Sequence, residues 1–304
     1  MTATLHHLDN LTQLDRSQIE RLLDRAQAIA DGADTTDLLR GRTVLNLFFE
    51  PSTRTRTSFE LAARRMGACL VNFDTAYAST KKGESLIDTL HTLEAMQIDA
   101  LVVRHKEAGT PTFLTHHTRS KVAIINAGDG NRAHPTQGLL DALTIRQQRP
   151  DLSALRVVIC GDVAHSRVAR SDVQALERLG VKDLRLCGPH ALLPAAIEIP
   201  ACTMYEDFDA AIEAADVVIM LRLQRERMQS TLVPDREDYF KLYGLTSARL
   251  KRAAPECLVM HPGPINRGIE IAPDVADGPQ SLILRQVSNG VYTRMAVLAE
   301  LLGV

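Results

Sequence analysis

The feature of this sequence that most restricts its fold is a repeated alternation of short apolar runs with helical segments. The runs that we expect to form strands are 44–49, 69–73, 100–103, 122–126, 156–160, 183–187 and 217–221. Segments with helical spacing lie between them, at 58–66, 86–96, 136–148 and 166–179. This alternation is typical of parallel sheets with helices on both faces. The sequence therefore predicts an α/β chain with two doubly wound parallel-sheet domains joined by helices.

The boundary between the two domains is indicated by glycine and proline residues that interrupt the alternation after the fourth predicted strand. We expect a first domain at 1–134, a connecting helix at 135–150 and a second domain at 151–287. A last helix at 288–304 is expected to pack back on the first domain and complete it. Two α/β domains predict a cleft between them, which is a common position for a small-molecule site.

Composition excludes several classes of partner. The 304 residues carry 35 Lys and Arg against 37 Asp and Glu, so the overall charge gives no attraction to nucleic acid or to a membrane surface. Five scattered cysteines without a C-x-x-C pair predict reduced thiols, with neither a disulfide framework nor a zinc site. The start of the chain lacks a basic flank followed by an apolar run, and no apolar segment approaches membrane length. We expect a cytoplasmic protein.

The turn after the first predicted strand starts a helix with hydroxyl side chains and arginines. Unpaired backbone N–H groups and the helix dipole make a helix N-terminus a seat for anions. Ser52, Thr53 and Thr55 add hydroxyl donors, and Arg54 adds a planar fork that can hold two phosphate oxygens. Helix capping is the ordinary role of Ser and Thr here, but Arg54 and Arg56 oppose the dipole. A bound phosphate would account for that cost.

Further polar residues follow the other predicted strands. Arginines at four predicted strand ends are Arg54, Arg104, Arg167 and Arg222, and His134 to Gln137 opens the connecting helix. A solvated arginine and a structural histidine are the ordinary alternatives at single positions. Together, however, four guanidinium groups at strand ends suit a site for several phosphate and carboxylate groups, because each anion needs a donor once water is removed. Residues 161–167 resemble a nucleotide-binding turn but lack G-x-G-x-x-G.

The segment from Phe49 to Arg56, together with His134-Pro135-Thr136-Gln137, resembles the aspartate/ornithine carbamoyltransferase family. The similarity runs through nearly the whole chain with its motifs in the expected order, and the Ser-Thr-Arg-Thr-Arg string is highly specific. The resemblance implies transfer of a carbamoyl group from carbamoyl phosphate to an amino acid, with no metal and no cofactor. It also implies a homotrimer whose active sites lie in the interdomain cleft and at the subunit interface. Regulatory or dihydroorotase-like partner chains occur in the family, and the sequence leaves both open.

The resemblance also assigns site residues. It implies that carbamoyl phosphate is held by Ser52, Thr53, Arg54, Thr55, Arg104, His134 and Gln137. It implies that the amino-acid substrate is bound by Lys82, Arg167, Arg222 and Gln224, with the backbone of Gly263 and Pro264 shaping the reacting centre. The implied catalytic residues are Arg54, Thr55, Lys82, Arg104 and His134. Lys82 would enter from a neighbouring subunit on a loop whose second candidate is Ser79, although the family serine stands one position earlier, at Ala78.

The chemistry of the reaction needs these residue types. An amine attacks a carbonyl carbon, and the oxygen of the tetrahedral species becomes negative, so donors aimed at that oxygen accelerate the reaction. By resemblance, Thr55, Arg104 and His134 would polarise this carbonyl, while phosphate leaves as a dianion held by Arg54 and the helix N-terminus. We expect the departing phosphate to take the amine proton. A role for His134 as general base is the alternative.

Three positions favour L-aspartate over L-ornithine as the second substrate. Ornithine-type members typically carry His-Pro-Cys-Gln and His-Cys-Leu-Pro, where this chain has Thr136 and Pro262. Arg222 also supplies a cation for the side-chain carboxylate of aspartate. The expected reaction yields N-carbamoyl-L-aspartate and phosphate, a step of pyrimidine biosynthesis. The alternatives are an ornithine-type enzyme, a catalytically silent or partner-dependent structural subunit, and a nicotinamide-linked dehydrogenase, which the missing glycine fingerprint disfavours.

Overall fold

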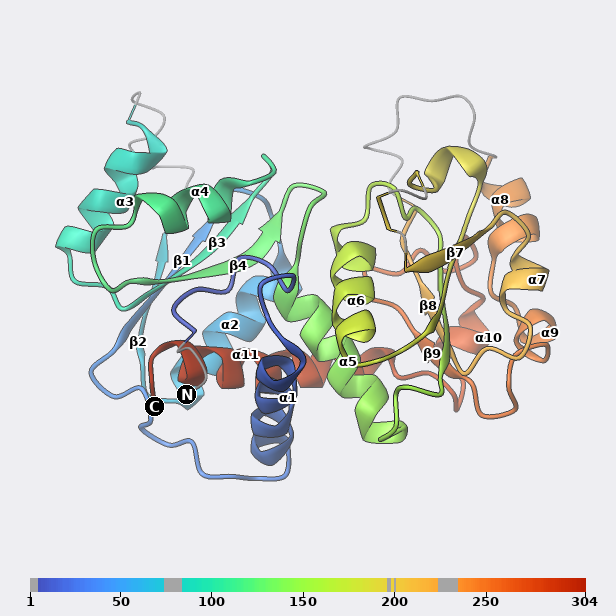
Figure 1. Ribbon diagram of the computed structural model, residues 1–304, viewed down its shortest axis with the longest axis horizontal. Helices are drawn as coiled ribbons and strands as arrows, with labels where there is room; N and C mark the ends of the chain where they lie inside the picture. The colour runs from blue at the N-terminus through green and yellow to red at the C-terminus, as the bar shows by residue number, and fades with distance from the viewer. Residues whose placement is uncertain (1–4, 74–83, 196–197, 200, 224–234) are drawn as a thin grey trace. The chain divides into compact units, whose positions relative to one another are not determined.

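The computed structural model describes residues 5–73, 84–195, 198–199, 201–223 and 235–304 (Figure 1). The chain divides into two compact units. Unit 1 comprises Met1–Leu143 and Val287–Val304, and unit 2 comprises Thr144–Gln286. Each boundary falls inside a helix, α5 (Pro135–Gln148) or α11 (Ile283–Leu301). The α/β class with two parallel sheets is confirmed. The boundaries expected at 134, 151 and 287, and the cleft between domains, stay predictions.

Unit 1 is built on a parallel sheet with the strand order β2-β1-β3-β4. Its strands are β1 (Thr43–Phe48), β2 (Cys69–Phe73), β3 (Ala100–His105) and β4 (Ala123–Asp129). Its remaining helices are α1 (Arg16–Ala30), α2 (Thr53–Arg65), α3 (Leu86–Ala95) and α4 (Thr110–His117). Figure 1 shows α3 and α4 on one face of the sheet and α2 with α11 on the other. The two layers of helices explain why the central strands read as nearly continuous apolar runs.

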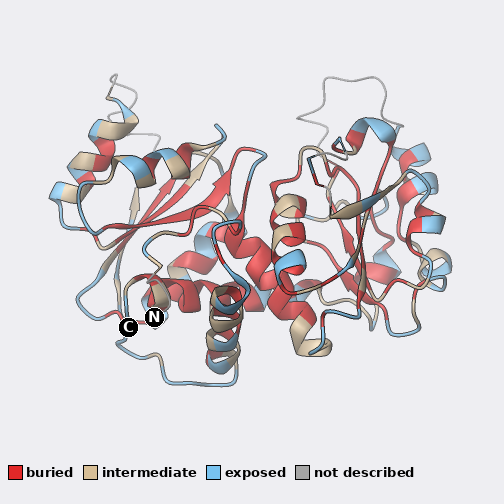
Figure 2. Ribbon diagram, in the orientation of Figure 1, coloured by how far each residue is buried: buried red, intermediate tan, exposed pale blue. Residues whose placement is uncertain are grey.

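Alternating residues of β1 supply both faces of the unit 1 core. Leu45 and Leu47 pack with Leu90 and Leu93 of α3 in one apolar cluster. The opposite face is closed by α2, whose Phe59 is fully buried. Figure 2 shows the central strands in red, the colour of buried residues. Helix α2 is thus held by its apolar side, which leaves its N-terminal turn at the edge of the sheet.

Unit 2 is built on a parallel sheet with the strand order β7-β6-β5-β8-β9. Its strands are β5 (Arg156–Cys160), β6 (Asp183–Cys187), β7 (Cys202–Tyr205), β8 (Val217–Met220) and β9 (Leu258–Met260). Its helices are α6 (Arg167–Arg178), η2 (His190–Leu192), α7 (Phe208–Ala211), α8 (Arg236–Tyr243), α9 (Ser247–Leu250) and α10 (Pro273–Ala276). A single apolar cluster that includes Phe208 and Tyr239, both almost completely buried, fills one side of this sheet.

Several elements differ from the expected ranges. Strand β3 continues through Arg104 to His105, so Arg104 belongs to the strand and not to the loop after it. The strand continues because Arg104 is still paired with Phe48 of the neighbouring β1. Helix α11 begins at Ile283, five residues before the expected 288, although Leu284 and Val287 are exposed and break the apolar pattern. The sequence pattern did not predict β7 or α4, which are only four and eight residues long.

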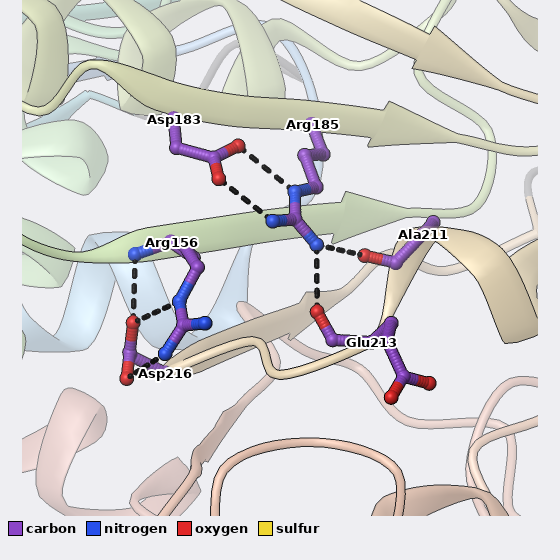
Figure 3. A network of polar contacts seen from close by, with 6 residues as sticks. All are labelled: Arg156, Asp183, Arg185, Ala211, Glu213 and Asp216. Carbon is purple, nitrogen blue, oxygen red and sulfur yellow. Dashed lines mark hydrogen bonds and ion pairs between the residues drawn. The ribbon is translucent and has the colours of Figure 1, made fainter.

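Two acid–arginine pairs hold the N-terminal ends of the unit 2 strands (Figure 3). Asp216, just before β8, accepts hydrogen bonds from the backbone N–H of Arg156 at 2.9 Å and from its Nε at 3.1 Å. Asp183 of β6 accepts two bonds from Arg185, at 2.8 and 2.7 Å. Nη1 of Arg185 also donates to the carbonyls of Ala211 and Glu213, each at 2.9 Å. The Arg156–Asp216 contacts tie the start of β5 to the start of β8, and Arg185 ties β6 to the segment that follows α7.

Asp216→Asn is expected to lower the free energy of unfolding by about 1 to 2 kcal/mol at pH 7. Burial raises the pKa of Asp216, but the hydrogen bonds from Arg156 outweigh it and hold this pKa below the ordinary value of 3.8. The ionised carboxylate therefore contributes stability above pH 3.8, and this contribution is lost as the pH falls through the lowered pKa. Urea unfolding of both proteins at several pH values measures the difference. A difference that does not shrink as the pH falls below 3.8 would contradict this explanation.

Candidate active site

The strand order of unit 1 reverses between β1 and β3. From β1 the chain moves outward to β2, and from β3 it moves outward on the other side to β4. In open parallel sheets, ligands bind outside the carboxyl ends of the strands at such a reversal. The two ends are joined here, because Phe48 is in register with Arg104 and the Phe49 N–H donates to the Arg104 carbonyl at 2.9 Å. The β1–α2 turn and Arg104 therefore meet at one edge of the sheet.

The N-terminus of α2 carries four of the predicted phosphate-binding residues. Ser52 is the N-cap residue, and its side chain makes no capping hydrogen bond within the part of the chain that the structure describes. The first turn contains no acidic residue. Thr53 and Arg54 are exposed, whereas Thr55 is buried. Ordinary capping thus does not account for Ser52, and this helix start combines the N–H groups of a helix N-terminus, hydroxyl groups and a cation, as an anion site requires.

Arg104 is held between two neighbouring segments. Its Nη1 donates to the carbonyl of Ala127 in β4 at 3.1 Å, and its Nε lies 3.4 Å from a carboxylate oxygen of Glu50. Both charged side chains are largely buried, at 14% and 17% exposure. Glu50 precedes the proline of the β1–α2 turn, so this pair joins the turn to β3. Glu50 was missed from the sequence, although a carboxylate at the start of an arginine-rich motif predicts an ion pair with one of the arginines of the site.

His134 and Gln137 lie at the carboxyl end of β4. A short turn after Asp129 is closed by the pairing of Asp129 with Ala133, and α5 then starts at Pro135. Both His134 and Gln137 are buried. The carbonyl of His134 accepts the Gln137 N–H at 2.9 Å, as in a first helical turn. Since β4 is the neighbour of β3, the structure brings these two residues to the same edge as Arg104.

The strand order of unit 2 reverses between β5 and β8, and the remaining two predicted arginines lie at this reversal. Arg167 is the first residue of α6, which follows β5, and its side chain is 6% exposed. The helix is capped by Ser166, whose hydroxyl accepts the Ala169 N–H at 3.1 Å. Arg222 follows Leu221, whose N–H donates to the Cys160 carbonyl of β5 at 2.7 Å. The structure thus places both arginines at the ends of adjacent strands.

Two glycines in unit 2 have specific backbone roles. Gly161 has φ +137°, and a Cβ there would lie 2.8 Å from the carbonyl oxygen of Leu221. Gly161 belongs to the segment 161–167 that resembles a nucleotide-binding turn. The close packing of the ends of β5 and β8 explains why a glycine is needed there. Gly263 has φ +69° and its peptide bond to Pro264 is cis. The positive φ favours glycine at this position. The Gly263 N–H also donates to Nδ1 of His261 at 2.8 Å.

Three predicted site residues, Ser79, Lys82 and Gln224, lie outside the residues that the structure describes. Within the described ranges, no group of three His, Cys, Asp or Glu side chains is arranged to hold a metal ion. No helix in the described part of the chain is long and apolar enough to cross a membrane. All five cysteines are free thiols, as the sequence predicts.

Comparison with protein families matches both halves of the chain. Residues 6–147 match the aspartate/ornithine carbamoyltransferase carbamoyl-P binding domain, and residues 153–301 match the Asp/Orn binding domain of the same enzymes. The chain belongs to the aspartate/ornithine carbamoyltransferase family. It is 54% identical over 305 residues to the aspartate carbamoyltransferase catalytic subunit of Stenotrophomonas maltophilia. This match covers 98% of this chain and 96% of that protein.

Solved structures show the same fold. The aspartate transcarbamoylase of Trypanosoma cruzi in complex with carbamoyl phosphate and aspartate is 30% identical, with a TM-score of 0.86. This match covers 97% of this chain and 96% of that one. The ornithine carbamoyltransferase of Pyrococcus furiosus gives a TM-score of 0.89 at 26% identity, with 99% of both chains covered. Because both types share the fold this closely, the choice between aspartate and ornithine depends on sequence.

Proposed function

We propose that this chain transfers the carbamoyl group of carbamoyl phosphate to the amine of L-aspartate, giving N-carbamoyl-L-aspartate and phosphate. The observation that carries the proposal is the placement of two basic side chains at the strand-order reversal of each sheet. Unit 1 places Arg54 and Arg104 there, and unit 2 places Arg167 and Arg222. One substrate carries a phosphate and the other carries two carboxylates, and guanidinium groups match both chemistries.

In this proposal, carbamoyl phosphate binds to unit 1. The N–H groups at the start of α2 and the hydroxyls of Ser52, Thr53 and Thr55 bind the phosphate oxygens, and Arg54 neutralises their charge. Phosphate departs as a dianion, and these groups already hold its charge before the bond breaks. The absence of a capping hydrogen bond from the Ser52 side chain and of an acidic residue in the first turn of α2, both within the described residues, supports the assignment.

The carbonyl oxygen is polarised by Thr55, Arg104 and His134. Negative charge develops on this oxygen as the amine of aspartate attacks, so donors aimed at it stabilise the transition state more than the ground state. The ion pair of Arg104 with Glu50 restricts the guanidinium before substrate binds, which lowers the cost of orienting it. A neutral His134 donates through a ring N–H, and the amine proton passes to the departing phosphate. His134 as general base is the competing route.

L-Aspartate binds through residues of unit 2. Arg167 and Arg222 hold its two carboxylates, and the backbone of Gly263 and Pro264 shapes the reacting centre. The position of Arg167 supports this role, because it starts α6 at the carboxyl end of β5, where ligands bind in open parallel sheets. Lys82, Gln224 and Ser79 are assigned by resemblance alone. In the proposal, Lys82 reaches the site of a neighbouring subunit, with Ser79 as a second loop residue.

Aspartate is preferred to ornithine because of residues near the amino-acid site. Thr136 and Pro262 stand where ornithine-type relatives typically carry cysteine, and Arg222 adds a cation that ornithine would not need. The names of the relatives at 54–55% identity agree with this choice. A catalytically silent or partner-dependent structural subunit is the second candidate. Regulatory or dihydroorotase-like chains, which the resemblance leaves open, would be the partners of such a subunit.

The remaining parts of the proposal concern the assembly and the cell. We infer a cytoplasmic homotrimer that acts in pyrimidine biosynthesis, since the resemblance implies sites completed by a neighbouring Lys82. Light scattering of the purified chain tests the trimer. Mixing Lys82→Ala with Arg54→Ala chains tests the shared site, because each mixed trimer regains some intact sites. A mixture that forms trimers and stays inactive would contradict sharing.

The test of the reaction is product formation by the purified chain with carbamoyl phosphate and either L-aspartate or L-ornithine. We expect saturable formation of N-carbamoyl-L-aspartate with one phosphate released for each product molecule. Citrulline formation would show that the amino-acid site was assigned to the wrong substrate. A folded chain that binds carbamoyl phosphate and yields neither product would favour the structural or partner-dependent subunit.

A further inference from the structure

Arg294 in α11 is a charged side chain enclosed by unit 1. The residue is 3% exposed, and its guanidinium carbon lies 5.1 Å from the ring centre of Phe59 in α2. Its Nη1 donates to the Gly290 carbonyl at 2.9 Å. Burial lowers the pKa of Arg294 to about 10, and the carboxylate of Asp141 opposes that effect. Arg294 therefore remains a cation at neutral pH, and Asp141 supplies an opposing charge.

Asp141 in turn contacts a residue of the carbamoyl phosphate site. It lies one helical turn after Gln137 in α5, and Nε2 of Gln137 is 3.2 Å from one carboxylate oxygen and 3.0 Å from the other. Asp141 is 1% exposed, and Gln137 is 9% exposed. An ionised carboxylate only accepts hydrogen bonds, so the Gln137 end that faces it must be the NH₂ group. The charge of Asp141 thus fixes which way the amide points.

This orientation has a consequence for substrate choice. With its NH₂ group directed at Asp141, Gln137 presents the carbonyl oxygen, an acceptor, on its other side. Phosphate oxygens and the carbamoyl oxygen are acceptors, and the carbamoyl NH₂ group is the hydrogen-bond donor that carbamoyl phosphate offers. Acetyl phosphate has the same charge and a similar size, with a methyl group at that position. An acceptor fixed at Gln137 therefore distinguishes the two acyl phosphates.

We infer that Asp141 is a positioning residue that holds the Gln137 amide in the orientation that selects carbamoyl phosphate over other acyl phosphates. Arg294 supplies a cation that interacts with Asp141, and it packs on α2, the helix that starts at the phosphate-binding turn. The inference rests on the proposed function, because it assigns Gln137 to the carbamoyl end. It adds the origin of the specificity, which lies in a buried charge pair behind the site.

The test compares the binding of carbamoyl phosphate, acetyl phosphate and inorganic phosphate to the full chain by calorimetry. In Asp141→Asn, the side chain of residue 141 offers an NH₂ group as donor and a carbonyl oxygen as acceptor. The two orientations of the Gln137 amide then become comparable in energy. We expect the preference for carbamoyl over acetyl phosphate to fall by about fivefold to tenfold, the value of one hydrogen bond. Inorganic phosphate binding should be unchanged. In a Gln137→Ala background, Asp141→Asn should cause no further loss of preference.

A second variant covers the case in which Asp141→Asn leaves a buried unpaired cation and fails to fold. Asp141→Asn combined with Arg294→Met removes both charges at similar volume, a change that buried ion pairs often tolerate. The same loss of preference is expected. Asp9→Asn is the matched control, because Asp9 is a buried carboxylate of unit 1 that accepts hydrogen bonds from Thr112 and Gln13.

The outcomes are separable. A folded Asp141 variant that keeps the wild-type preference would overturn the inference, and so would an equal loss of affinity for all three ligands, which indicates general loosening. A loss of preference in Asp9→Asn as large as in Asp141→Asn would also overturn it. A wild-type chain that binds carbamoyl phosphate no more tightly than inorganic phosphate would instead contradict the proposed function itself.

Discussion

Arg54→Ala is expected to lower kcat/KM for carbamoyl phosphate by about a thousandfold. The guanidinium both binds the phosphate and stabilises its charge as it leaves, so kcat and KM should change together. The free energy of unfolding should stay constant or rise by a few tenths of a kcal/mol, because the arginine opposes the dipole of α2. Steady-state kinetics with both substrates and urea unfolding measure the two effects. Opposite signs for activity and stability are typical of a residue retained for binding.

Arg56→Ala is the matched control, two positions further along the same helix. The side chain of Arg56 is 48% exposed, and its Nε lies 3.3 Å from Glu60 in an ordinary pair between neighbouring helical turns. Such exposed pairs contribute little. We therefore expect kcat/KM and the equilibrium constant of unfolding each to change by less than about threefold. Equal losses of activity in the two variants would show that a general positive field acts there, and that Arg54 is not a specific phosphate ligand.

Arg167→Ala should raise the KM for L-aspartate by about a hundredfold, with little effect on the binding of carbamoyl phosphate. Arg167 is buried at the start of α6, where its guanidinium would meet a substrate carboxylate without competing water. Removal of one partner from a buried charge pair leaves the other charge unmatched, which explains the large effect. Initial rates at varied aspartate, together with calorimetric titration of carbamoyl phosphate, separate the two substrates.

Arg170→Ala lies one turn further along α6 and provides the comparison. Arg170 donates to the surface residue Glu198 at 2.9 Å, and Glu198 is 46% exposed. The KM for aspartate should therefore stay within about twofold of the wild-type value. If Arg167→Ala weakened both substrates equally, the assignment of unit 2 to aspartate would be wrong.

Much of the fold could be predicted because each central strand is buried on both faces. The apolar runs at 156–160 and 183–187 coincide with β5 and β6 at both ends, and the run at 69–73 also coincides with β2, although β2 is a partly exposed edge strand. The order of the strands could not be predicted, because alternation fixes that a sheet is parallel and says nothing of the side on which each strand is added. That order decides that Arg104 lies beside the β1–α2 turn and that Arg222 lies beside the β5 end.

The residues that sequence reasoning missed are those that act through contacts distant along the chain. Glu50 forms an ion pair with Arg104, which is 54 positions away in the sequence. No local sequence pattern predicts that pair. Asp141 had a weaker local signal, since Gln and Asp one helical turn apart commonly interact on helices. Its charge interaction with Arg294 could not be foreseen, because no local pattern links α5 to α11, although the expected last helix at 288–304 includes Arg294. Charged residues inside apolar helices were the signal to follow.

The return of the last helix to unit 1 has a consequence for how the protein is made. Unit 1 contains residues from both ends of the sequence, and the whole of unit 2 is inserted between them. During synthesis, a chain folds from its N-terminus onwards. The sheet of unit 1 is thus translated early, but Phe59 can contact Arg294 only after the whole of unit 2 has been translated. A ribosome-bound nascent chain would therefore acquire its aspartate-side unit before its phosphate-side unit is finished.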